Sequence, residues 1–196
     1  MTLTHKTKNT WRFDGDTLVL LNRPNGVEII TEAMDWVLDY TWRIGYNHKT
    51  GKVQAVATSI PNRGSGSRQI SLSLHRLIME NVPHGPEQTE IDHKDGNPLN
   101  NRLDNLRYVT TRVNQWNRRD VNGMPLRGIS RKTTCWRSRP WYAQIKKVDG
   151  TQTGKAFSTA REAEEHYLKL KRQYHPETPE IWFEQYAECQ AKGYWG

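Results

Sequence analysis

The apolar residues of this 196-residue chain come in short runs that are separated by turn residues. Over residues 11–58 apolar and polar residues alternate, with turn signals such as NRPNG and HKTGK between the runs. Alternation with a period of two is typical of strands that bury one face. This part of the chain therefore predicts a small β-rich module. Within it, residues 31–40 (TEAMDWVLDY) predict a short helix that is capped by Thr31.

A second series of elements follows a flexible connection at residues 61–68, PNRGSGSR. ISLSLHRLIMENV predicts a short strand that runs into a helix, which the following prolines end. Next, residues 88–93 and 106–109 predict two strands around the turn-rich loop KDGNPLNNRLDN. A further helix begins near Thr110 or Thr111, either of which can cap it. The predicted order is strand, loop, strand, helix.

The carboxy-terminal part has its own pattern of three β segments and one helix, over residues 126–174. The β segments are GISR, WYAQIKK and KAFS, and VDG is a tight turn. In the predicted helix, apolar residues recur at steps of three and four, and Thr159 with Glu162 fits a capping box. The aromatic tail after Pro176 is expected to dock on this part of the chain.

Composition limits the classes of protein. Cys135 and Cys189 stand in unrelated contexts without a CxxC spacing, so we expect two free thiols and neither a zinc cluster nor a disulfide framework. The sequence has no run of about 18 apolar residues. Its first ten residues lack the apolar centre of a secretory signal. We therefore expect an intracellular, cytoplasmic protein without a membrane partner.

Positive charge is concentrated in one region. Residues 101–147 hold twelve Lys and Arg against two Asp and Glu, a net charge of +10, whereas the whole chain carries +8. Most of these cations are Arg at irregular spacing among Trp and Asn, which suits phosphate contact and stacking on nucleic acid. A solvated basic face is the alternative. An RNA-binding protein would also fit this charge, but the chain has no recognisable aromatic motif for reading RNA.

The segment IDHKDGN places reactive groups at the end of a predicted strand. Asp92 and His93 are adjacent, so their side chains diverge to opposite sides of the backbone. Asp92 offers a hard oxygen ligand for Mg²⁺ or Mn²⁺, and an imidazole with an ordinary pKa of about 6.5 can accept a proton near neutral pH. An amide oxygen of Asn114 or Asn117, from the following helix, could reach the same ion. Asn105 is better placed to bond loop backbone and hold the hairpin.

These residues resemble the HNH (ββα-metal) endonuclease family, particularly its phage-encoded and homing members. The resemblance rests on LHRLIM, IDHKDGNPLNNRLDNLRYVT and NQWNRR. It implies that Asp92 and Asn114 hold one divalent metal ion, that His93 is the general base, and that Asn105 is the central structural asparagine of the catalytic motif. His75 recurs in the LHR segment and is either a structural residue or a phosphate contact. In isolation, DHKDGN is also typical of a turn whose side chains bond their own backbone.

The carboxy-terminal part resembles the plant ethylene-response-factor type of DNA-binding domain. RGIS, WYAQI and FSTAREAEEHY carry that resemblance. In that family a three-stranded sheet enters the major groove. GKAF, Ser130 and the insert TTCWRSRP depart from the family pattern, so base specificity does not transfer. Core packing is the alternative for Trp136 and Trp141. The DNA-contacting residues expected from this resemblance and from the basic stretch are Arg118, Arg119, Arg127, Arg131, Trp141 and Lys146.

Together these patterns predict an α+β protein that acts on double-stranded DNA. The expected function is a metal-dependent endonuclease that hydrolyses phosphodiester bonds, with homing as one biological role and with a nick or a double-strand break as its product. The alternative is a non-catalytic, sequence-specific DNA-binding regulator. The expected modules are a β-rich module at 1–62, a ββα-metal nuclease core at 63–122, a three-stranded sheet packed on one helix at 126–175, and a tail at 176–196.

Overall fold

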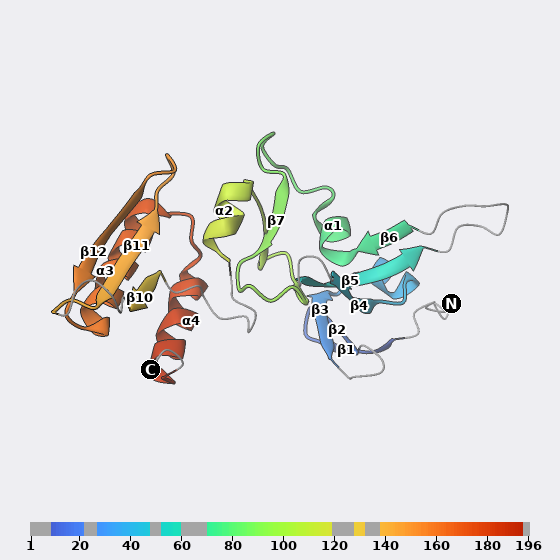
Figure 1. Ribbon diagram of the computed structural model, residues 1–196. Helices are drawn as coiled ribbons and strands as arrows, with labels where there is room; N and C mark the ends of the chain where they lie inside the picture. Colours follow the sequence, from blue (N-terminus) through green and yellow to red (C-terminus); the bar gives the residue numbers. More distant parts are fainter. Residues whose placement is uncertain are drawn as a thin grey trace. The chain divides into compact units, whose positions relative to one another are not determined.

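The computed structural model describes residues 9–21, 27–47, 52–59, 70–118, 128–131 and 138–193. The chain divides into two compact units, Met1–Tyr108 and Val109–Gly196, and each contains a hydrophobic core. Both units combine short strands with helices, and the longer helices, α3 and α4, belong to the second unit (Figure 1). The expected α+β class is confirmed at this level, and the finer division into modules stays a prediction.

A four-stranded sheet in the first unit joins the N-terminal strands to a distant loop. Its order is β1-β2-β3-β8. The first three strands are antiparallel neighbours, whereas β8 pairs in parallel with β3 through Ile30 with Asn100 and Thr31 with Asn101. This short strand inside the loop was not predicted. The strands are β1 (Thr10–Asp14), β2 (Thr17–Leu21), β3 (Glu28–Glu32) and β8 (Asn100–Asn101).

A second sheet of the first unit leads directly into helix α1 (Figure 1). Its last strand ends at Ser73 and the helix begins at Leu74, so the predicted strand that runs into a helix is confirmed. Leu74, Ile78 and Met79 of α1 lie in the same core as Leu18 of β2. The N-terminal strands and α1 therefore share one core. The elements are β4 (Arg43–Asn47), β5 (Lys52–Ser59), β6 (Ile70–Ser73) and α1 (Leu74–Met79).

The helix predicted over residues 31–40 is wrong in both its start and its type. Thr31 lies inside β3, where it pairs with Leu18 of β2 and is fully buried, so it caps no helix. A single 3₁₀ segment, η1 (Asp35–Asp39), follows, without a side-chain cap. The physical reason for the later start is that pairing with β2 extends the strand through Glu32, so that no helix can begin at Thr31.

The predicted order of strand, loop, strand and helix is present over residues 90–116. Strands β7 (Glu90–His93) and β9 (Leu106–Val109) pair with each other. Helix α2 (Thr111–Trp116) then begins in the second unit, and the Thr110 hydroxyl accepts from the Val113 N–H at 3.2 Å. Of the two predicted caps, Thr110 and Thr111, the first is the one present.

The second unit is built on an antiparallel sheet in the order β10-β11-β12, with α3 packed on one of its faces (Figure 1). Ala163, Tyr167 and Leu170 supply the buried face of α3. The capping box of Thr159 and Glu162 is confirmed. The bounds are β10 (Ile129–Arg131), β11 (Trp141–Lys146), β12 (Gln152–Phe157) and α3 (Ala160–Tyr174).

The aromatic tail forms helix α4 (Glu180–Ala191) and completes the core of the second unit. Trp182 and Tyr186 are fully buried and stack at 5.3 Å between ring centroids. Both rings lie near Tyr167 of α3, at 6.5 and 6.2 Å between centroids, so the tail docks on α3, while the sheet itself packs on α3 as expected. Cys189 on α4 is a free buried thiol, as expected, and Cys135 lies outside the described residues. Within the described part of the chain, no helix is long and apolar enough to cross a membrane.

A glycine in the second unit gives a direct test of this core. A Cβ atom at Gly128 would overlap the ring of Tyr167, which is buried against the sheet and α4. We predict that Gly128→Ala lowers the free energy of unfolding by about 1–3 kcal/mol, the usual cost of overpacking. Urea unfolding followed by circular dichroism measures this change.

Gly85→Ala serves as the control, because its added methyl group meets the Gln88 side chain only at an ordinary contact distance of 3.4 Å. If Gly128→Ala unfolds at the same urea concentration as the wild-type protein, the close packing of the Tyr167 ring on residue 128 is wrong.

Candidate active site

The loop between β7 and β9 is held by its own side chains. The Asn105 amide accepts from the Asp95 N–H at 3.1 Å and donates to the Asp95 carboxylate at 2.9 Å and to the Asn100 carbonyl at 2.8 Å. The Asn100 amide donates to the other Asp95 oxygen at 2.8 Å. Gly96 adopts a φ of 73°, a conformation that favours glycine, in the turn after His93. Asn105 thus makes the loop bonds expected of it, while its part in catalysis stays a prediction.

His93 ends β7 beside two residues of other elements. Its Nε2 lies 3.5 Å from the Asn101 Oδ1, and its ring meets the ring of His75 edge to face at 5.6 Å between centroids. Burial lowers the pKa of His93 below its usual 6.5, although the Asn101 amide and the carboxylates of Asp95 and Asp92 act in the opposite direction. The imidazole is therefore neutral near pH 7 and has a lone pair that can accept a proton.

Asp92 is a buried carboxylate, 6% exposed, next to His93. The Arg107 guanidinium on β9 donates to its Oδ2 from Nε at 3.0 Å and from Nη2 at 2.8 Å. This pairing holds the Asp92 carboxylate in one orientation. Both Arg107 contacts fall on the same carboxylate oxygen.

Asn101 is the residue of this site that sequence reasoning missed. It is fully buried on β8, and its Nδ2 has no hydrogen-bond partner within the described structure. β8 pairs with β3, so the N-terminal sheet sets the position of the amide that faces His93. Two asparagines inside a turn-rich loop carry no strand signal, and pairing with β3 is a long-range contact. The one signal that could have suggested a buried Asn101 is the concentration of asparagines in NPLNN, residues 97–101.

His75 lies on α1 and faces His93. Its Nδ1 is buried without a hydrogen-bond partner among the described residues. Burial, followed by the charges of His93 and Arg76, lowers the pKa of His75 to about 4. His75 is therefore uncharged near pH 7 and does not attract phosphate as a cation. The structure brings the two histidines together, and the function of His75 stays a prediction.

The residues expected to complete a metal site lie on α2, in the second unit. Asn114 is half-buried within the helix, and Asn117, 4% exposed, is its C-terminal cap residue. Within the described part of the chain no three His, Cys, Asp or Glu side chains gather as a metal-binding group. Carboxylate and amide oxygens are ligand types that Mg²⁺ accepts, and that ion usually keeps several waters and takes few protein ligands.

The residues expected to contact DNA are partly described. Arg118, Arg131 and Lys146 are exposed, and Arg131 lies over the Trp141 ring at 6.0 Å from its centroid. Trp141 is half-buried and packs on the core of the second unit, so part of its surface serves packing. Arg119, Arg127 and Trp136 lie outside the described residues.

Comparison with known proteins gives a match over the two strands β7 and β9 and the helices before and after them. Residues 73–116 match the family model of the HNH endonuclease. We call these residues the HNH segment; they include β7, β8, β9, α1 and α2. The match supports a nuclease function in general. It covers all four residues of the expected motif, but it does not test their individual roles.

A relative from a phage shares part of the chain. Protein 3.8 of Escherichia phage T7 is 43% identical over 56 residues, which cover 26% of this chain and 46% of that protein. The chain thus spans less than half the length of this relative. No solved structure matches the chain. The resemblance of the second unit to plant ethylene-response factors is not among these findings.

We predict that Asn101 fixes the tautomer of His93. The Asn101 Oδ1 can only accept, so it requires a proton on the His93 Nε2 and leaves the lone pair on Nδ1. Asn101→Ala removes this acceptor, and we expect the ring ¹⁵N chemical shifts of His93 to move toward a mixture of tautomers. NMR of protein labelled with ¹⁵N-histidine measures this directly.

Asn97→Ala is the matched control, because Asn97 belongs to the same loop but is exposed, and its side chain accepts from the Leu99 N–H at 3.0 Å. Unchanged His93 shifts in Asn101→Ala would show that another group selects the tautomer.

Proposed function

We propose that this protein is a metal-dependent DNA endonuclease that hydrolyses phosphodiester bonds. The observation that carries the proposal is the HNH match over residues 73–116, together with a buried Asp92 and a half-buried His93 at the end of a strand whose following loop is fixed by hydrogen bonds. A general base must be neutral at the working pH and held in one orientation. His93 has the lowered pKa and the Asn101 contact that these two requirements call for.

In this proposal His93 accepts a proton from water at Nδ1 while its Nε2–H stays on Asn101. The water oxygen then attacks phosphorus, and the leaving group is a deoxyribose oxygen. Arg107 holds the Asp92 carboxylate in place beside the base. One HNH segment provides one such group and therefore cuts one strand in each binding event.

Asp92 and Asn114 are the residues that would hold a divalent ion, Mg²⁺ or Mn²⁺. Carboxylate and amide oxygens are the ligand types that these ions prefer. Arg107 occupies one oxygen of Asp92, so an ion would share this carboxylate with the guanidinium. When bound, such an ion stabilises negative charge on the phosphoryl and leaving oxygens.

We further propose that the second unit binds duplex DNA in the manner of the plant ethylene-response-factor type of domain. Its support is the sequence resemblance and an antiparallel sheet β10-β11-β12 that packs on α3 by one face. Arg131 and Lys146 are exposed on the strands of this sheet. Homing as the biological role is a proposal of the same kind and rests on the family resemblance.

We predict that the wild-type protein nicks supercoiled plasmid in Mg²⁺ and not in EDTA. His93→Ala should slow nicking by about 10²–10⁴-fold, the usual contribution of a general base, while DNA binding is kept. Agarose-gel separation of nicked from supercoiled plasmid measures the rate. His84→Ala, a change of an exposed histidine in the same unit, should keep the wild-type rate.

Two results would contradict this function. Retained turnover in His93→Ala would remove the proposed base. DNA binding without nicking in Mg²⁺ or Mn²⁺ by the wild-type protein would instead support a non-catalytic regulator.

We predict that Asp92→Asn weakens Mn²⁺ binding by about tenfold or more, since even outer partners of metal ligands contribute about 10- to 100-fold to affinity. Isothermal titration with Mn²⁺ measures this without reference to turnover. Asp104→Asn is the control, because Asp104 is an exposed carboxylate of the same loop that pairs with Arg102. Equal Mn²⁺ affinities of Asp92→Asn and wild type would exclude Asp92 as a ligand.

A further inference from the structure

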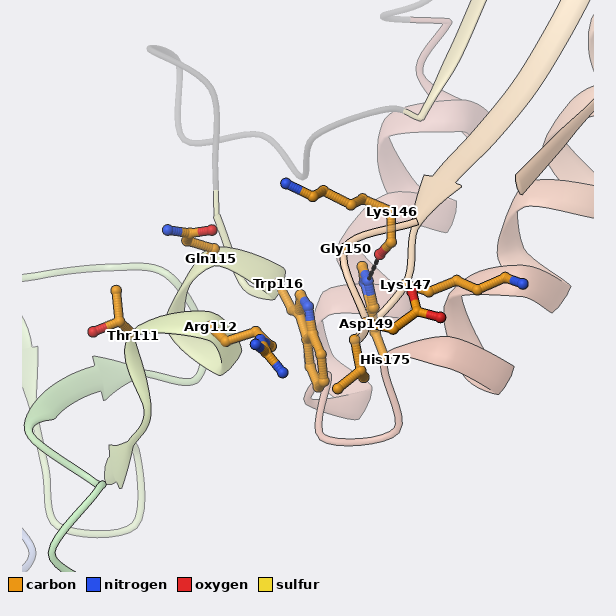
Figure 2. A pocket seen from close by; sticks show the side chains of 10 residues that line it. Thr111, Arg112, Gln115, Trp116, Lys146, Lys147, Asp149, Gly150 and His175 are labelled. Atoms are coloured by element: carbon orange, nitrogen blue, oxygen red, sulfur yellow. Dashed lines mark hydrogen bonds between the residues drawn. The ribbon is translucent and has the colours of Figure 1, made fainter. Parts of the chain in front are cut away.

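A cleft of about 510 Å³ lies within the second unit, between one face of α2 and the turn that joins β11 to β12. Arg112, Gln115 and Trp116 line it from the helix, at the spacing of three and four residues that defines one helical face. Figure 2 shows Lys146 and Lys147 on the opposite wall, with His175 beside Trp116. The cleft therefore brings together basic residues that are more than thirty positions apart in the sequence.

The floor of this cleft is built from buried, mutually bonded groups. The Trp116 and His175 rings stack at 4.4 Å with an interplanar angle of 9° (Figure 2). Lys171, 3% exposed, donates from Nζ to the Trp116 carbonyl at 2.6 Å and lies 3.2 Å from the His175 Nδ1. The other ring nitrogen of His175 donates to the Lys146 carbonyl at 2.8 Å. These contacts tie α2 to β11 and α3, so the cleft is formed before any ligand arrives.

The walls of the cleft carry net positive charge. Arg112 and Lys146 are exposed, and the Lys147 ammonium lies over the Tyr174 ring at 5.0 Å. The acidic group of the lining, Asp149, accepts from the N–H and hydroxyl of Thr151 at 2.8 and 2.6 Å, which turns its charge toward its own loop. Burial lowers the pKa of His175 to about 4, so this ring adds no charge near neutral pH.

We propose that this cleft binds the phosphate backbone of duplex DNA. The proposal rests on the proposed endonuclease function and adds a contact surface to it. A guanidinium, an ammonium and the Gln115 amide are donors that phosphate oxygens accept from without regard to base sequence. Arg112 and Trp116 each stand two residues from Asn114, about 200° around the helix, so the cleft uses the opposite face of α2. A backbone held there leaves the predicted metal ligand uncovered.

The test measures binding of the full-length protein to a fluorescent 20-base-pair DNA duplex in EDTA, by anisotropy, over a range of NaCl concentrations. Each phosphate contact contributes about 0.9 to the slope of log K against log salt. The double change Arg112→Gln with Lys146→Gln should lower this slope by about 1.8, which corresponds to about 60-fold weaker binding in 0.1 M salt. Each single change should lower it by about 0.9, or about eightfold.

Lys169→Gln is the matched control, since Lys169 is an exposed lysine of α3 outside the cleft and should keep the wild-type slope. Thermal midpoints equal to the wild-type value verify that the exposed substitutions leave the fold intact. A double variant with the wild-type slope, in a protein that still nicks plasmid, overturns the cleft proposal and leaves the endonuclease function standing. A wild-type protein that neither binds duplex DNA nor nicks it overturns both.

Discussion

The geometry of the candidate active site depends on the hydrogen bonds that Asn105 makes across its loop. By holding Asp95 and the Asn100 carbonyl at once, this amide fixes the chain on both sides of the turn that follows His93. The fixed loop presents β8 to the edge of β3, and the parallel pairing there buries Asn101 against His93. One side-chain amide thus supports both the strand that carries the imidazole and the strand that carries its partner. Loss of the Asn105 side chain would destabilise both strands, because a buried polar network with unsatisfied members is costly.

The second unit depends in a similar way on a buried cation. Removing an ammonium from water is costly, and it is tolerated only where donors find partners. Lys171 meets the Trp116 carbonyl, the neutral His175 ring and the face of Trp182 at 4.6 Å. The pKa of His175 must be low for this arrangement, since a protonated ring could not accept from the ammonium. As a result α2, which carries Asn114 and belongs to the HNH segment, is also packed against the end of α3.

The sequence was sufficient where local chemistry decides the structure. The cap at Thr110, the capping box at Thr159, and the strands before and after the loop follow from short-range patterns, and all are present. It was insufficient where pairing across the chain decides. Thr31 was expected to cap a helix because it precedes a helical pattern, yet β2 draws it into a strand. Asn101 and β8 were missed for the same reason, because nothing in NPLNN indicates that β3 lies beside it. The pairing of Arg107 with Asp92 also needs the β7–β9 register, which the sequence leaves open.

The HNH match covers the residues of the predicted catalytic motif but not all of the residues that form the surrounding core. The 44 residues from 73 to 116 carry the motif, but their apolar side chains are too few for a core of their own. Leu74, Ile78, Met79 and Leu106 are buried in one core that also contains Leu18, Leu20 and Ile29 of the N-terminal strands. At the other end, Trp116 is covered by His175, which comes from the end of α3. Residues on both sides of the HNH segment in the sequence therefore cover its apolar side chains. A fragment limited to the matched residues would expose these apolar faces, so the stable unit of this protein extends beyond its recognisable motif in both directions.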